Sequence, residues 1–310
     1  MTRSGSDGAR VSLSRRNAWI AIALLSVAAS CTGLLNGFAF DDIFVIVKNP
    51  SLHSLAGTWR VFGETYWPAA QGAALYRPLT SLAFVVQWAI GGGAPLPFHV
   101  VSILLYACAC IAFYELAVLI VAPAAALAAA AIFAVHPLHV EAVANVVGQA
   151  EVWAALVIFC TVAWYIRARR AGLLRPRQML GLALAYLVAC AFKEHAIVLP
   201  ALLLLAELTV AGENRSWSER LKSVAPLMIV LAVAAAAFIV VRTSVIGRLQ
   251  GAGLNDLLRG QPFGTRFFTM LRVVVEWVRL FFWPANLSAD YSSRRIEVAT
   301  SFESGMLPGL

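Results

Sequence analysis

The sequence has few charged residues for its length. Only 13% of its 310 residues are Asp, Glu, Lys or Arg, whereas about a quarter are charged in an ordinary soluble domain. Hydrophobic residues make up 61% of the chain, and the mean hydropathy is +0.79. This composition excludes an ordinary soluble domain and indicates an all-α integral membrane protein with several spans.

Motifs for metal, redox and nucleotide chemistry are also missing. The five cysteines lie inside apolar stretches without a CxxC pair, so we interpret them as small core residues. The chain has no Walker lysine loop and no GxGxxG at the start of a helix. No nucleotide cofactor is therefore expected, and no metal is firmly expected. The net charge of +8 lies largely in loops, which indicates membrane topology rather than nucleic-acid binding.

Seven apolar stretches approach the length of about 20 residues that a membrane span needs. They are residues 18–38, 98–122, 123–136, 151–168, 178–192, 196–211 and 223–241. The third, fifth and sixth are short, which favours a bundle with a thin wall around a cavity. We interpret the first as a retained helix rather than a signal peptide, because its apolar run continues to about Phe40.

The distribution of arginines predicts the sidedness of the chain. Residues 1–17 and the loops after the fourth and sixth stretches are rich in arginine, so the positive-inside rule places them in the cytoplasm. Residues 39–97 then form a first outer loop, and residues 242–310 a second one. The segment 242–266 also carries four arginines, against this rule. The outer helix ends carry the unusual polar residues: Asp41, Asp42, His136, His139, Glu141, Lys193, Glu194 and Arg242.

Two further apolar segments are expected on the outer surface. Residues 79–90 are too few to cross a bilayer. Residues 266–284 place Arg272, Glu276 and Arg279 on one stripe of a helix, opposite several aromatic side chains. This pattern is typical of a helix that lies in the membrane interface, so both segments are expected to cover the outer end of the bundle.

Each polar group has a structural interpretation when it is taken alone. His136 and His139 can cap or pack a helix, and two histidines without a third ligand are weak evidence for a metal. Arg77 precedes Pro78, a residue favoured at the first position of a helix. Lys193 and Glu194 can form an interfacial ion pair.

Together on one face, these groups suit an anionic substrate with an apolar part, such as a lipid phosphate. We expect Arg77, Lys193 and Arg242 to neutralise phosphate oxygens. One of Asp41 and Asp42 would take the proton from an attacking hydroxyl. A glycosidase pair is disfavoured, because consecutive side chains of an extended segment point to opposite sides. The two aspartates are expected to differ in role, and which one is the base stays open.

Several motifs resemble the membrane region of the TMTC proteins, which are transmembrane and TPR-containing protein O-mannosyltransferases of the GT-C class. The most specific one is the run His136-Pro-Leu-His139-Val-Glu141-Ala-Val143. The others are Phe40-Asp41-Asp42, Asn49-Pro50, Tyr76-Arg77-Pro78-Leu79-Thr80, Phe98-His99, Val146-Val147-Gly148-Gln149-Ala150-Glu151, Phe192-Lys193-Glu194 and Trp283-Pro284-Ala285-Asn286-Leu287-Ser288-Ala289-Asp290-Tyr291.

The resemblance implies a GT-C-type helix bundle over residues 18–310, with about seven spans. It implies inverting transfer of a mannose-like sugar from a polyprenyl-phosphate donor to a protein Ser or Thr hydroxyl, with Asp41 and Asp42 as the catalytic motif. The residues expected to line the cavity are Tyr76, His136, His139, Glu141, Glu194, Asp290 and Tyr291. The chain stops at Leu310 without TPR repeats, so it is expected to be a truncated or partial member.

The resemblance leaves two other kinds of protein to consider, a transporter or flippase of a lipid-linked or anionic solute and an inactive membrane scaffold. Transporters hold their substrates near the midplane in repeated architectures, and no repeat of the polar motifs is visible here. The expected partners are a lipid-linked sugar donor, a protein acceptor and membrane lipids. The expected location is the bacterial inner membrane or the eukaryotic endoplasmic reticulum, with the N-terminus cytoplasmic and the site extracytoplasmic.

Overall fold

The computed structural model describes residues 14–68, 75–211, 215–247, 258, 260–285, 287–288 and 297–302. Within these ranges all regular secondary structure is helical, which confirms the predicted all-α class. The helices of the bundle and its coverings are α1 (Arg15–Ser30), α2 (Pro78–Gly91), α3 (Pro95–Ala117), α4 (Pro123–Val135), α5 (Val140–Ala144), α6 (Gln149–Arg170), α7 (Pro176–Phe192), α8 (Leu199–Ala206), α9 (Trp217–Ile246) and α10 (Phe263–Phe282).

The described part of the chain contains five helical segments that are long and apolar enough to cross a membrane. They are Arg15–Leu35, Pro95–Ala117, Val146–Arg170, Glu194–Ala211 and Trp217–Ile246. A sixth results if α4 is joined to Pro137–Ala144 across a bend of 48°. The remaining predicted stretch is α7, which has 17 residues. All seven predicted stretches are helical, and the chain is a multi-pass membrane protein.

One predicted boundary is wrong. The second outer loop was expected to begin at Arg242, but α9 continues to Ile246 and includes this residue. The helix ends where Gly247 adopts the left-handed backbone (φ 75°) that commonly follows the last helical turn. Arg242 therefore belongs to the last turns of a long helix.

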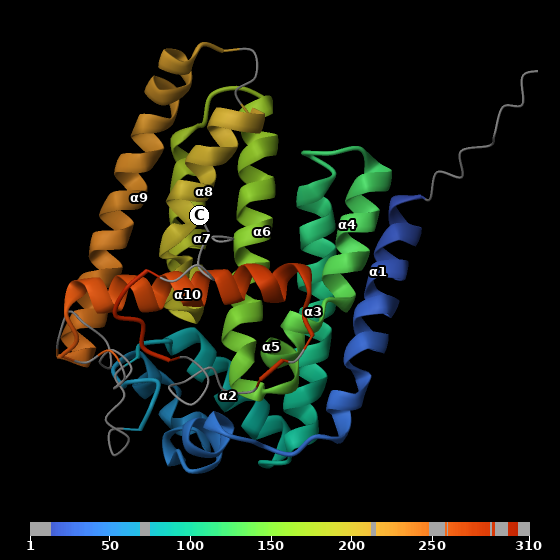
Figure 1. The fold of residues 1–310 in the computed structure, drawn as a ribbon, viewed down its shortest axis with the longest axis vertical. Coiled ribbons are helices and arrows are strands. Elements are labelled where there is room, and N and C mark those ends of the chain that lie inside the picture. The colour runs from blue at the N-terminus through green and yellow to red at the C-terminus, as the bar shows by residue number, and fades with distance from the viewer. Residues whose placement is uncertain are drawn as a thin grey trace, which may run out of the picture.

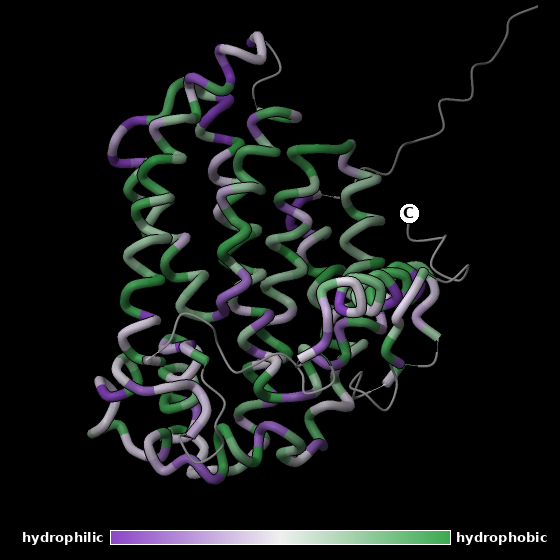
Figure 2. Tube along the Cα trace, turned by 60° about the vertical axis from the view of Figure 1, so that its left-hand side comes forward, coloured by the Kyte–Doolittle hydropathy of each residue, from purple (hydrophilic) through white to green (hydrophobic). Residues whose placement is uncertain are grey.

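The long helices run side by side, and α10 lies across them (Figure 1). The starts of α1 and α9 and the end of α6 lie at one end of the bundle. At the other end lie α2, α5 and the segment between α1 and α2. Hydrophilic segments gather toward the two ends, whereas the middle of the bundle is mostly hydrophobic (Figure 2). This distribution fits a bundle whose middle lies in hydrocarbon.

The described residues between α1 and α2 form a packed cap. It contains the short helices η2 (Ile43–Val47), η3 (Pro50–Leu52) and η4 (Leu55–Phe62). Its core combines side chains of these turns with side chains of α2, α3 and the start of the α6 region: Val45, Ile46, Leu52, Val61, Tyr66, Phe84, Val85, Phe98 and Val146. Because a fully buried apolar side chain contributes roughly 1.5–3 kcal/mol, this core holds the cap firmly against the bundle.

A broken helix brings a second polar segment to the same end. α4 stops before Pro137, which lacks the N–H that a continuing helix needs. The chain then forms η6 (Pro137–His139), α5 and η7 (Val146–Gly148) before α6 begins. This succession of short turns places Glu141 and Asn145 beside the cap, where they line the same cavity as Asp41.

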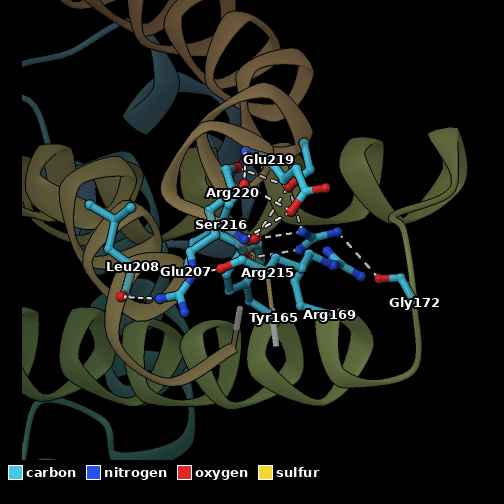
Figure 3. A network of polar contacts seen from close by, with 10 residues as sticks. Tyr165, Arg169, Gly172, Glu207, Leu208, Arg215, Ser216, Glu219 and Arg220 are labelled. Carbon is cyan, nitrogen blue, oxygen red and sulfur yellow. Dashed lines mark hydrogen bonds and ion pairs between the residues drawn. The ribbon is translucent and has the colours of Figure 1, made fainter. Parts of the chain in front are cut away.

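A buried ion pair joins α6 to the region of α8 and α9 (Figure 3). Arg169 and Glu207 are both fully buried, and the Arg169 Nε atom donates to Glu207 Oε2 at 2.8 Å. The Tyr165 hydroxyl donates to the same oxygen at 2.8 Å, and Arg169 also donates to Ser223 at 2.7 Å. Every charge in this network has a partner, as a buried ion pair requires. The pair lies within helices of the bundle, away from the residues that line the cavity beside the cap.

Candidate active site

The acidic motif places its two aspartates in different environments. Asp42 is fully buried. Its carboxylate accepts hydrogen bonds from the backbone N–H groups of Ala39 (3.1 Å), Val146 (3.3 Å) and Val147 (2.8 Å). Burial raises the pKa of Asp42, and these three N–H groups oppose the rise. Asp42 thus ties the cap to the segment that opens α6.

Asp41 is exposed and lines a cavity of about 550 Å³ at the capped end of the bundle. Partial removal from solvent raises the pKa of Asp41 above its ordinary value, and the Arg77 guanidinium opposes this rise. The other residues around the cavity are Tyr66, Trp67, Leu75, Arg77, Leu138, Glu141, Ala142, Asn145, Val147, Gly148, Glu151 and Lys193. A cavity of this size is typical of small-molecule sites.

Arg77 is held in place by a carboxylate and an aromatic ring. Its Nε and Nη2 atoms donate to the two oxygens of Glu194, at 2.8 and 2.7 Å. Its guanidinium also lies 4.9 Å from the centre of the Tyr66 ring. Bidentate pairing and cation–π contact both fix the plane of a guanidinium. Arg77 is therefore a pre-positioned cation at the wall of the cavity.

Lys193 is the second cation of this wall. It follows the last residue of α7 and forms an ion pair with Glu151 of α6. Burial and the nearby Arg77 lower the pKa of Lys193 to about 8, although the carboxylates of Glu194 and Glu141 oppose this shift. His195 Nε2 lies 3.1 Å from the same carboxylate.

Two buried polar atoms around this cavity have no hydrogen-bond partner among the described residues. They are the Tyr66 hydroxyl and Asn145 Oδ1. Burial raises the pKa of Tyr66, so its hydroxyl stays protonated. Buried polar groups in folded proteins are nearly always paired, so these two atoms are suited to a ligand or water. Sequence reasoning missed both residues, because neither stands in a charged or histidine-containing motif.

A second cavity, of about 570 Å³, adjoins the first and shares Asp41, Glu141 and Asn145 with it. A third cavity, of about 470 Å³, adjoins the second and contains the predicted histidines His136 and His139. The histidines therefore line a neighbouring cavity rather than the one that holds Arg77 and Lys193.

Both histidines have structural contacts. His136 Nδ1 accepts from the backbone N–H of Leu138, and its Nε2 lies 3.0 Å from the carbonyl oxygen of Phe281 in α10. His139 Nδ1 lies 2.8 Å from the Tyr106 hydroxyl. In the described ranges, no group of three or more His, Cys, Asp and Glu side chains is placed to hold a metal ion.

The remaining predicted site residues have other positions. Tyr76 is buried, and its hydroxyl donates to the carbonyl of Phe62 at 3.0 Å. Glu194 is not among the residues that line the cavity, but it pairs with Arg77, which does line it. Arg242 lies in α9 and is not among the residues that line the cavity. Asp290 and Tyr291 lie outside the described residues.

Comparison with known proteins identifies relatives that match from about half to most of this chain. The protein O-mannosyl-transferase Tmtc2 of Drosophila melanogaster is 32% identical over 277 residues, which is 86% of this chain and 29% of the relative. Drosophila Tmtc1 is 28% identical over 84% of this chain and 32% of its own length. Human TMTC4 is 32% identical over 49% of this chain and 23% of its own length. No family model and no solved structure matches the chain.

Fold and site together define a multi-pass helical membrane protein with a polar cavity at one end of its bundle. The alignments show that the chain is a TMTC-like protein, related to the protein O-mannosyl-transferases over the region that it shares with them. The chain spans less than a third of the length of the Drosophila relatives.

Proposed function

We propose that this chain transfers a mannose-like sugar from a polyprenyl-phosphate donor to a hydroxyl of a protein Ser or Thr, with inversion at the sugar carbon. The names of the relatives support a sugar transferred to protein. The observation that carries the proposal is one cavity that contains an exposed carboxylate, Asp41, and two cations, Arg77 and Lys193. A transferase to a hydroxyl needs a base and an anion-binding wall in such proximity.

Asp41 is the proposed base. The acceptor oxygen attacks C1 of the sugar as the C1–O bond to the phosphate breaks, and the electron pair of that bond stays on the phosphate oxygen. The hydroxyl proton moves to the Asp41 carboxylate. A single displacement inverts the configuration at C1. Asp42 is unsuited to this role, because it is buried and accepts three backbone hydrogen bonds.

Arg77 and Lys193 are the proposed contacts of the donor phosphate. Negative charge grows on the phosphate as it leaves, so fixed cations stabilise the transition state more than the ground state. The Glu194 and Glu151 carboxylates hold these cations before the donor binds. Pre-positioned charges need little reorganisation during the reaction, which is the condition for efficient electrostatic stabilisation.

A lipid-linked donor fits the location of the cavity at the end of an apolar bundle. The exposed apolar side chains of α10, which include Phe267, Trp277 and Phe281, suit an interfacial position. Because the arginine-rich starts of α1 and α9 lie at the opposite end, the proposed site is extracytoplasmic. The absence of a nucleotide-binding motif in the sequence also favours a lipid-linked sugar over a nucleotide sugar.

The proposal is tested with purified protein in vesicles, a polyprenyl-phosphate mannose with labelled sugar, and threonine-containing peptides. A transferase moves the label to peptide and releases the lipid phosphate. A flippase moves the intact donor across the bilayer, and a scaffold does neither. Labelled peptide that depends on the protein supports the proposal, whereas translocated and unreacted donor contradicts it.

A further inference from the structure

Phe40 has an unusual backbone directly before the proposed base. Its φ of 47° makes it the one non-glycine residue with a positive φ in the described ranges. A left-handed backbone is unfavourable for an aromatic residue and is maintained only when surrounding contacts enforce it. The Ala39 N–H bond to Asp42 (3.1 Å) and the Asp42 N–H bond to the Ala39 carbonyl (3.0 Å) close the turn around Phe40.

This turn leaves an aromatic side chain exposed at the surface of the protein. Phe40 is 69% exposed and lines the cavity of about 570 Å³, which also contains Asp41. The apolar neighbours Val140 and Leu287 line the same cavity. An exposed aromatic ring beside a reactive carboxylate is a contact surface for an apolar group of a substrate.

The two cavities that meet at Asp41 differ in their cations. The first is lined by Arg77 and Lys193 as well as by the carboxylates of Asp41, Glu141 and Glu151. The described lining of the second contains the carboxylates of Asp41 and Glu141 and no Lys or Arg. Glu141 is exposed, so its charge faces whatever enters. An anionic donor therefore suits the first cavity, and a neutral or cationic group suits the second.

Asn145 supplies a hydrogen-bond acceptor at the junction. Its Oδ1 atom is buried, has no partner among the described residues, and belongs to a side chain that lines both cavities. An unpaired amide oxygen beside the proposed base suits a backbone N–H of a bound chain. The second cavity thus offers a base, an acceptor for N–H, an apolar surface and a negative charge.

From these observations we propose that the second cavity binds the acceptor as a peptide. Its Ser or Thr hydroxyl reaches Asp41, an apolar neighbour packs on Phe40, and a basic neighbour pairs with Glu141. The inference rests on the proposed transfer reaction and names the class of acceptor sequence. Glu141 is the reason for the preference for a basic residue near the acceptor hydroxyl, and Phe40 is the reason for the preference for an apolar one.

The first test compares peptides that carry one threonine between an apolar residue and either lysine or glutamate. Peptide binding and sugar transfer are measured separately, with saturating polyprenyl-phosphate mannose in the transfer assay. We expect the wild-type protein to prefer the lysine peptide by about tenfold in both readouts. Glu141→Lys should abolish or reverse the preference. Glu64→Lys is the matched control, since it makes the same charge change at an exposed position that lines neither cavity.

The second test removes the aromatic surface. Phe40→Ala should raise the KM for the lysine peptide about fivefold and leave the KM for the donor unchanged. Trp59→Ala removes another exposed aromatic of the cap and should change neither constant. Equal effects of Phe40→Ala on both substrates would overturn the assignment.

The outcomes separate this inference from the reaction itself. If sugar is transferred but Glu141→Lys leaves the peptide preference unchanged, the acceptor assignment is wrong and the proposed reaction stands. If the peptides bind with the expected charge preference but receive no sugar, the acceptor assignment stands and the proposed reaction is wrong. Equal affinity for both peptides, with or without transfer, overturns the inference.

Discussion

The carboxylate of Asp42 accepts a hydrogen bond of 2.8 Å from the backbone N–H of Val147, 105 residues further along the chain. This contact joins the cap to the turn that opens α6. It also separates the roles of the adjacent aspartates, because Asp42 is committed to backbone groups while Asp41 lines the cavity.

Replacing Asp42 with alanine should destabilise the fold. The substitution removes the acceptor of three backbone N–H groups, of which that of Val146 is buried and those of Ala39 and Val147 are partly buried. An unsatisfied buried donor costs about 1–3 kcal/mol. Thermal unfolding in detergent, followed by tryptophan fluorescence, should show a midpoint several degrees lower. Asp41→Ala is the matched control and should unfold close to the wild-type midpoint, and equal midpoints for the two variants would contradict the structural role of Asp42.

The donor KM should rise at alkaline pH. Burial and Arg77 lower the pKa of Lys193 to about 8, so the cation is present below this pH and is lost as the pH rises through it. The donor phosphodiester stays anionic over this pH range, so the attraction weakens only because Lys193 loses its charge. Steady-state kinetics between pH 6.5 and 9.5 should show the rise in donor KM near pH 8. In the complex, the bound phosphate favours the charged form of Lys193, so its pKa is somewhat higher there.

Lys193→Arg supplies the control for this pH dependence. Arginine keeps its charge up to about pH 12, so the variant should lose the alkaline rise in donor KM even if its affinity is lower at neutral pH. If the donor KM of Lys193→Arg still rises at alkaline pH as in the wild type, the titrating group is not Lys193.

Substitution of Arg77 should weaken donor binding more than substitution of Arg242. Arg77→Lys keeps the charge but loses the bidentate bond to Glu194 and the contact with Tyr66, which together orient the guanidinium. We expect a rise of about tenfold in donor KM. Arg242 does not line the cavity, so Arg242→Lys should change the donor KM less than twofold. A larger effect for Arg242→Lys than for Arg77→Lys would place the phosphate nearer to α9.

Removing one partner of the buried pair Arg169–Glu207 should destabilise the bundle. Arg169→Met leaves Glu207 as an uncompensated buried charge, which costs about 3–5 kcal/mol. The double variant Arg169→Met with Glu207→Leu should recover most of this loss, as measured by thermal unfolding. Arg170→Met is the control, since Arg170 is exposed and donates to the carbonyl of Leu119, in the turn after α3, at 2.8 Å. A double variant as unstable as the single one would contradict the account.

Several elements of this fold were predictable from the sequence because their signals are local. Apolar length defines a membrane helix, and the positions of Arg272, Glu276 and Arg279 define one polar stripe of α10. The end of α9 was placed too early, because Arg242 was taken as the start of a loop although the apolar pattern resumes after it.

The site itself was only partly predictable. The polar motifs drew attention to Asp41, Arg77, Glu141 and Lys193, and the structure places these four residues around one cavity. The partners of the cations were not visible, since Arg77 pairs with Glu194 across 117 positions of the sequence. The different roles of Asp41 and Asp42 also depend on distant backbone groups, and no local pattern distinguishes two adjacent carboxylates.

The central claim is that Asp41 is the base of a sugar transfer. Its most direct test is the rate of sugar transfer from polyprenyl-phosphate mannose to a threonine peptide by wild-type protein and by Asp41→Asn in vesicles. General-base catalysis contributes about 100- to 10,000-fold, so the variant should lose at least about 100-fold in rate while its unfolding midpoint and donor binding stay near those of the wild type. A variant that is stable, binds the donor and transfers sugar at the wild-type rate would contradict the account.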